Sequence, residues 1–328
     1  MKRKGFTLVE LLVVISIIAL LMAILMPVLA KVKAIANQMV CGTNLSGIGK
    51  GMTLYSGDNE DEYPMAGGRQ PKWSANPQCI KSPFSIDPTT DPPYGTSTTG
   101  NSVTVSSSLY LLVKYADMGP RQFVCKGDIG TTEFKLADYT TAPTTNFELT
   151  DAWDFGEKTD GLPGTHCSYS YHMPYWASAI PISKTVGFPI SPAGNPSSPL
   201  CADRNLYADK NAADYRPTKA DGSGKNTKTN EDYPSWQGTS PGNYLDRYKT
   251  GNSASHQRNG QNVLFNDIHV SFEKYPNVGI NQDNIWIYWG GAVPAKPQEY
   301  QLTGTIPKVG QGAPYSEKDA LLVNEVNP

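Results

Sequence analysis

The chain opens with one long apolar segment and then changes character. From Phe6 to Ala30 the residues are predominantly apolar, and Glu10 is the only charged residue among them. A helix needs about 20 such residues to cross the hydrocarbon core of a bilayer, and this run is longer than that. A secretory signal has an apolar stretch of only about 7–15 residues, so the segment is expected to stay in the mature protein. We therefore predict a membrane-spanning helix over residues 6–30.

The charges beside this segment predict its orientation. Lys2, Arg3 and Lys4 precede it, and positive residues favour the cytoplasmic side of a membrane. Lys31 and Lys33 follow it and weaken the asymmetry. We expect a cytoplasmic N-terminus, with the rest of the chain outside the cytoplasmic membrane.

Two residues inside the segment do not suit a simple anchor. The Glu10 carboxylate would cost about 2.5–3.5 kcal/mol at the bilayer centre, and less near an interface, so it calls for a positive partner. Pro27 lacks a backbone donor and kinks or locally opens a helix. From the residues alone, a plain anchor with a snorkelling Glu10 and a chance proline remains open.

Beyond residue 30 the pattern predicts an amphipathic helix over residues 31–57, with one face on a globular domain. The apolar positions at steps of mostly three or four are Ile35, Met39, Leu45, Ile48, Met52 and Tyr55. Four glycines interrupt it, namely Gly42, Gly47, Gly49 and Gly51. Each costs about 1 kcal/mol relative to alanine in a helix interior, so we expect bending or fraying before Gly57.

The acidic run at residues 58–62 is predicted to end this helix as a solvated loop. A calcium loop is the alternative, but the run lacks the spacing of an EF-hand.

The remaining chain, residues 58–328, is predicted to be an extracytoplasmic, mainly antiparallel β domain with long loop insertions. Leu109 to Ala116 has helical spacing, with the serines at 106–108 as expected caps. Residues 262–265 and 269–272 predict a β-hairpin. Residues 284–289 alternate as a strand expected to pack on the long helix. The 30 glycines and 26 prolines indicate many turns.

Charge excludes one class of partner. The 28 lysines and arginines balance 30 acidic residues, for a net charge of −2. Without a basic excess, we predict no nucleic-acid binding.

The sequence around the start of the apolar segment, residues 4–14, resembles the prepilin N-terminus of type IV pilins and type II secretion pseudopilins. The resemblance implies that a prepilin peptidase removes residues 1–5. It would cut between Gly5 and Phe6 and methylate the new Phe6 amine. It also implies a pilin-like α+β fold, with a long N-terminal α-helix packed on an antiparallel β-sheet.

The resemblance gives roles to both unusual residues. Glu10 would meet the positive Phe6 amine of an adjacent subunit when staggered helices stack in a filament. Removing one partner of such a buried pair costs about 3–5 kcal/mol, so the pair would fix the register of assembly. Pro27 resembles the proline at which the packed filament helix locally melts in this family.

Several downstream segments resemble a subfamily of large pseudopilins with an H-X9-DG motif. In order they are residues 41–45, 107–115, 123–125, 168–171, 200–203 and 256–270. The match is imperfect, because ten residues (257–266) separate His256 from Asp267 and Ile268 stands where glycine belongs. A β-branched residue tolerates positive φ poorly, so we expect the turn to shift onto Asn266 and Asp267.

The five cysteines would lie on the oxidising side of the membrane, where disulfides persist. They are Cys41, Cys79, Cys125, Cys167 and Cys201. Cys41 and Cys125 fall in family-like segments, so the resemblance makes them the first candidate pair. Buried free thiols are the alternative.

Two constellations leave other functions open. His256 with Asp267, or with His269 and Asp203, has the residue types of a hydrogen-bonding cluster, a metal site or an acid–base pair. No hydrolase, zinc or phosphate-binding motif accompanies them. Trp286 and Trp289 suit a sugar-stacking surface or a buried strand. We predict no enzymatic activity, no metal and no cofactor.

The predicted function is that of a structural subunit of a type IV pilus-like extracellular filament, a homo-polymer assembled by a prepilin peptidase and a secretion machinery. Before assembly the chain would span the cytoplasmic membrane once. One alternative is a pseudopilin in a short periplasmic pseudopilus. Another is a membrane-anchored glycan-binding module or enzyme.

Overall fold

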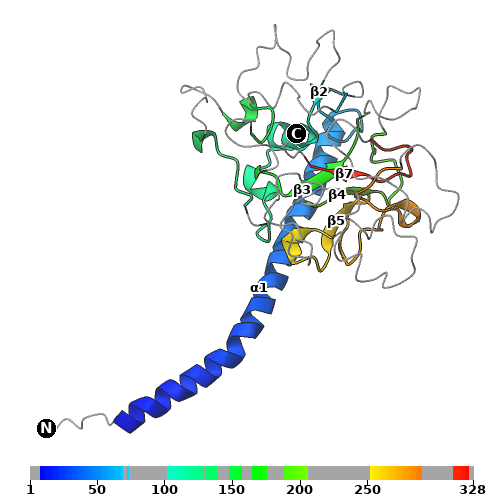
Figure 1. Cartoon of the computed structure of the whole chain (residues 1–328). Helices are drawn as coiled ribbons and strands as arrows, with labels where there is room; N and C mark the ends of the chain where they lie inside the picture. Colours follow the sequence, from blue (N-terminus) through cyan, green and yellow to red (C-terminus); the bar gives the residue numbers. More distant parts are fainter. Residues whose placement is uncertain are drawn as a thin grey trace, which may run out of the picture.

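One helix dominates the architecture. In the computed structural model, α1 (Leu8–Asp58) runs from the N-terminal end into a β-rich head, and it curves gently before it reaches the head (Figure 1). The structure describes residues 8–68, 72–73, 102–128, 130–138, 148–156, 165–175, 188–205, 252–289 and 313–324. The helix is unbroken through Pro27.

A five-stranded sheet forms the centre of the head, in the order β6-β5-β4-β3-β7, and all its pairings are antiparallel. Its strands are β3 (Tyr169–His172), β4 (Pro199–Asp203), β5 (Gln261–Phe265), β6 (Val270–Glu273) and β7 (Leu322–Val323). A small parallel pair joins β1 (Lys72–Trp73) and β2 (Ser102–Val103). The other helices are α2 (Val105–Tyr115), η2 (Pro120–Phe123), η3 (Leu136–Asp138), η4 (Leu149–Asp151), η8 (Ala254–His256) and η9 (Ile280–Gln282). The predicted α+β class is confirmed.

The C-terminal part of α1 packs into the core of the head. Leu45, Ile48 and Met52 are fully buried there beside residues of β3, β4 and β5. Ile35 and Met39, which were expected on the packed face, are 52% and 67% exposed. The contact with the head therefore begins later along the helix than the sequence pattern predicts.

The expected fraying of α1 before Gly57 is wrong, because the helix continues to Asp58. Packing explains this. A Cβ on Gly49 would lie 2.9 Å from Leu264 Cδ1 and 3.0 Å from Ile268 Cγ2, so the missing side chain lets the helix approach β5 closely. The burial gained along this face offsets the helix-propensity cost of about 1 kcal/mol for each glycine.

The predicted hairpin is confirmed as β5 and β6, and its turn has Asn266 and Asp267 at its centre as expected, but the positive φ at the next residue was not expected. Ile268 itself adopts φ of +67°. The Ile268 N–H donates to Phe265 O at 2.9 Å, and the Phe265 N–H donates to His269 O at 3.0 Å. This is a three-residue loop whose last residue is left-handed. Ile268 also packs against the main core, so apolar contact holds it in a conformation that costs about 1–2 kcal/mol.

The strand expected over residues 284–289 is also wrong, because the segment forms a turn. Trp286 is buried with Val263 and Phe265 in a second apolar cluster. These two β5 residues alternate with Leu264, which belongs to the core around α1. Alternate residues of a strand point to opposite faces, so Trp286 covers the sheet face away from α1.

The cap of α2 also differs from the expectation. The helix begins at Val105 rather than Leu109, and Thr104 is its N-cap. The Ser107 N–H donates to Thr104 Oγ1 at 3.1 Å. Ser107 and Ser108 are buried inside the helix instead of capping it.

Two buried carboxyls tie the C-terminal segment to the turn after η9. Asp283 accepts hydrogen bonds from Trp289 Nε1 (2.8 Å) and the Ala320 N–H (2.7 Å). Asp319 accepts from the N–H groups of Trp289 (3.0 Å) and Tyr315 (2.6 Å). Burial, and then the nearby Asp319 charge, raises the pKa of Asp283 from 3.8 to about 9. Burial raises the pKa of Asp319 from 3.8 to about 7.

Substituting Leu45 tests the helix–sheet interface. We expect Leu45→Ala to lower the free energy of unfolding of the head by about 2–5 kcal/mol, because it leaves a cavity at a fully buried site. The matched control is Leu54→Ala on the same helix, where the leucine is 57% exposed and the change should stay within about 0.5 kcal/mol. Denaturant unfolding of the full chain in detergent measures both. Equal effects at the two positions would contradict the interface.

The carboxyl pair predicts that stability falls as the pH rises. A carboxyl whose pKa is higher in the folded than in the unfolded chain takes up a proton on folding. The stabilisation is therefore complete below the unfolded pKa of about 4, and it is lost as the pH rises through 7 and 9. Each carboxyl that stays protonated contributes a slope of about 1.4 kcal/mol per pH unit.

Asp319→Asn should make this dependence shallower by about half between pH 5 and 7, where both carboxyls stay protonated in the folded chain. Its amide oxygen can still accept from the N–H groups of Trp289 and Tyr315. Its amide nitrogen replaces Oδ1, which has no hydrogen-bond partner among the described residues. The measurement is urea unfolding followed by tryptophan fluorescence at several pH values. Parallel pH curves for the variant and the parent would show that the carboxyl does not titrate as described.

Candidate functional site

The first candidate site is the N-terminal part of α1 that projects from the head (Figure 1), called here the stem, residues 8–40. Its large apolar side chains from Leu8 to Leu29 are between 45% and 78% exposed. The helix is long and apolar enough to cross a membrane, and its most apolar window is not buried against the protein. So large an apolar surface requires a lipid or protein environment.

The stem carries few polar groups, and their positions are informative. Glu10 lies in the first turn of α1 and is exposed. Ser16 Oγ donates to Val13 O at 2.8 Å, so this hydroxyl is satisfied within the helix. Gly5 and Phe6, the predicted processing residues, lie outside the described residues. The carboxylate of Glu10 thus remains the one acidic side chain in the apolar run of the stem.

The second candidate site lies where α1 enters the head. Cys41 is the first buried residue of α1, and a disulfide joins it to Cys125, which follows η2. Cys167 and Cys201 are buried and form no disulfide within the described part of the chain, and burial raises the pKa of the Cys201 thiol well above its ordinary value. Cys79 lies outside the described residues.

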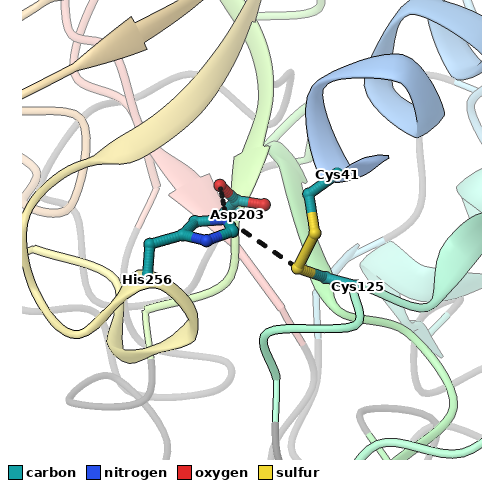
Figure 2. A group of neighbouring side chains, drawn as sticks. All are labelled: Cys41, Cys125, Asp203 and His256. Carbon is teal, nitrogen blue, oxygen red and sulfur yellow. Dashed lines mark hydrogen bonds and ion pairs between the residues drawn. A yellow bond between two sulfur atoms is a disulfide. The ribbon is translucent and has the colours of Figure 1, made fainter. Parts of the chain in front are cut away.

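Beside this disulfide lies a buried histidine–aspartate pair. Figure 2 shows the His256 ring from η8 between the Asp203 carboxylate and the disulfide. Its Nε2 is 2.9 Å from Asp203 Oδ2 and 3.8 Å from Cys125 Sγ. We call Cys41, Cys125, Asp203 and His256 the neck cluster, and all four are buried.

Asn262 on β5 holds the pair in place. Its backbone N–H and its Nδ2 both donate to Asp203 Oδ2, at 2.7 and 2.9 Å. Nδ2 also lies 3.3 Å from Gln38 O of α1. A Cβ on Gly42 would lie 3.3 Å from Asn262 Oδ1, so this glycine makes room for the amide. The cluster therefore links α1, β4 and β5.

The sequence offers Asp267, His269 and Asp203 as partners of His256. In the structure, only Asp203 of these three lies next to it. Asp267 and His269 pair with each other at the β5–β6 turn, where both are about half exposed. His256 precedes β5 and the turn follows it, so the length of a strand separates them. Asn262 carried no sequence signal, because an amide in an alternating strand pattern predicts nothing by itself.

The other candidate surfaces are closed or lack ligand geometry. Trp286 and Trp289 are 1% and 0% exposed, so neither ring presents a sugar-stacking surface. His256 is 8% exposed and Asp203 is fully buried, which leaves no open approach for a substrate. Within the described ranges, the neck cluster is the only close group of three or more His, Cys, Asp or Glu side chains, and the acidic run at 58–62 does not form one.

Comparison with known proteins identifies the N-terminal motif. Residues 1–26 match the family model of the prokaryotic N-terminal methylation motif, which is the prepilin motif of type IV pilins and pseudopilins. Neither a curated protein nor a solved structure matches the chain. The motif supports a type IV pilin-like or pseudopilin-like protein, the apolar helix and the α+β fold are consistent with it, and the motif implies processing by a prepilin peptidase.

The disulfide gives a stability prediction. It spans 84 residues of sequence, and removing it should lower the free energy of unfolding by about 2–5 kcal/mol. Cys41→Ala, Cys125→Ala and the double variant should lose similar amounts, because either single change already breaks the bond. Independent side chains would instead give additive losses. Non-reducing digestion and mass spectrometry of the parent should yield one cross-linked peptide containing both cysteines.

Proposed function

We propose that this protein is a structural subunit of a type IV pilus-like extracellular filament. The observation that supports this most directly is the exposed apolar stem on a chain that carries the prepilin motif. In the membrane, lipid surrounds the stem. After extraction, stems of other copies provide the only equivalent apolar environment, so helices would bundle in the filament core with the heads outside.

Glu10 supplies the register of this bundle. After removal of residues 1–5, the Phe6 amine becomes the positive N-terminus, four residues before Glu10 in the same chain. Stacking with an axial stagger brings Glu10 of one copy to the amine of a neighbour. Each charge is then neutralised in the apolar core, whereas a mismatched register leaves both uncompensated.

The proposed role is structural rather than enzymatic. The buried positions of His256, Trp286 and Trp289 give no support to a catalytic or glycan-binding module built on these residues. Head–head contacts and the long loops then set the outer surface of the filament.

Electron microscopy of sheared surface material, with peptide identification, tests the proposal. We expect long fibres that contain this chain and begin at an N-methylated Phe6. Short assemblies confined to the cell envelope would instead assign the chain to a pseudopilus. A chain that keeps Met1 and occurs only as a dispersed monomer would overturn both assignments.

Glu10→Gln separates assembly from membrane insertion. The amide is nearly isosteric but cannot neutralise the Phe6 amine, so we expect normal insertion and a loss of fibres of at least about tenfold, consistent with about 3–5 kcal/mol per broken pair. The matched control, Ser16→Ala, removes a hydroxyl that is satisfied within the same helix and should assemble normally. Membrane fractionation and quantification of sheared fibres measure the two steps. Normal fibre yield from Glu10→Gln would refute the pairing.

A further inference from the structure

The neck cluster has the donor set of a transition-metal site. It offers two cysteine sulfurs, one imidazole nitrogen and one carboxylate oxygen, and these four atoms all lie within 4.8 Å of one another. In a tetrahedral zinc site, bonds of about 2.0–2.3 Å place neighbouring ligand atoms about 3.3–3.8 Å apart. The distances of His256 Nε2 to Asp203 Oδ2 (2.9 Å) and to Cys125 Sγ (3.8 Å) are already close to that range.

Groups outside the four ligands also suit a metal. Asn262 donates twice to Asp203 Oδ2 and fixes the orientation of the carboxylate. Asp203 Oδ1 is buried without a hydrogen-bond partner among the described residues, although a buried carboxylate oxygen normally has one. Hydrogen bonds that orient a ligand are typical of metal sites, and their loss usually lowers metal affinity about 10–100-fold.

The disulfide determines when such a site exists. With Cys41 bonded to Cys125, neither sulfur is a thiolate, and a thiolate is the form that binds zinc. The newly made chain carries both residues as thiols. Until an oxidant of the compartment removes two electrons and two protons, the two sulfurs are separate and free to adopt tetrahedral spacing.

We propose that the neck cluster binds one zinc ion in the reduced chain, through Cys41, Cys125, His256 and Asp203. Binding releases the two thiol protons and leaves the sulfurs as thiolates, with no change of oxidation state. The ion cross-links α1 to β4 and η8 before the disulfide forms. Thiolate and imidazole ligands favour zinc over calcium or magnesium, which prefer oxygen. This inference does not depend on filament assembly.

Cobalt(II) is a suitable probe, because a cobalt ion in tetrahedral coordination by thiolates absorbs strongly in the visible range. It also shows charge-transfer bands from the thiolates. The full chain is purified in detergent, reduced with a phosphine that does not bind metal tightly, and titrated with cobalt. We expect one cobalt per reduced chain, bleaching by one equivalent of zinc, and no bands in the oxidised chain. A reduced chain without these bands, or equal uptake by the oxidised chain, overturns the proposal.

Variants assign the ligands. Cys79→Ala, Cys167→Ala and Cys201→Ala together leave the neck pair as the only cysteines, and this control should keep the bands. His256→Gln and Asp203→Asn should each weaken cobalt affinity about tenfold or more. Circular dichroism of α1 monitors folding in every sample. Loss of the bands in the triple variant, or unchanged affinity in both ligand variants, places the metal elsewhere and overturns the assignment.

Discussion

The structure depends on one constraint: a single helix must satisfy two different environments along its length. In its N-terminal part, α1 presents apolar side chains all round, and none of the residues that the structure describes packs over them. From Cys41 onward its buried residues, among them Leu45, Ile48 and Met52, lie in the head. Because the helix is continuous between the two parts, the position and tilt of the stem are set by how the head holds its C-terminal part.

The head holds α1 by close approach rather than by a wide apolar stripe. Gly49 lets the backbone of the helix come near Leu264, and Gly51 faces Met118 in the same way, since a Cβ there would lie 2.3 Å from Met118 Sδ. A helix that approaches a sheet this closely gains dispersion contacts along its backbone. The disulfide and the Asn262 amide then fix the helix along its axis, at the end of the head nearest the stem.

The sequence predicts the parts of this structure that depend on local pattern. The apolar run, the prepilin motif and the β5–β6 hairpin follow from periodicity or from specific residues at fixed offsets. The errors occur where tertiary contacts override local preference. Gly49 costs helix propensity but allows packing, and Ile268 accepts a left-handed conformation because its side chain contacts the core. The pairing of His256 with Asp203 joins residues far apart in the sequence, so no local pattern could select it over Asp267.

The location of the neck cluster has a mechanical meaning in the proposed filament. Stems would be held in the filament core and heads outside, so a force that pulls on a head reaches α1 first at its last contact with the head, which is near Cys41. If the helix were held there by non-covalent contacts alone, these would break one after another, and breaking each would cost only a few kcal/mol. The disulfide between Cys41 and Cys125 does not break in this way, so α1 separates from the head only when the core of the head unfolds. The buried His256–Asp203 pair lies beside this bond, and Asn262 ties the pair to α1 through Gln38 O, so the disulfide is supported by polar contacts at the same point of the helix.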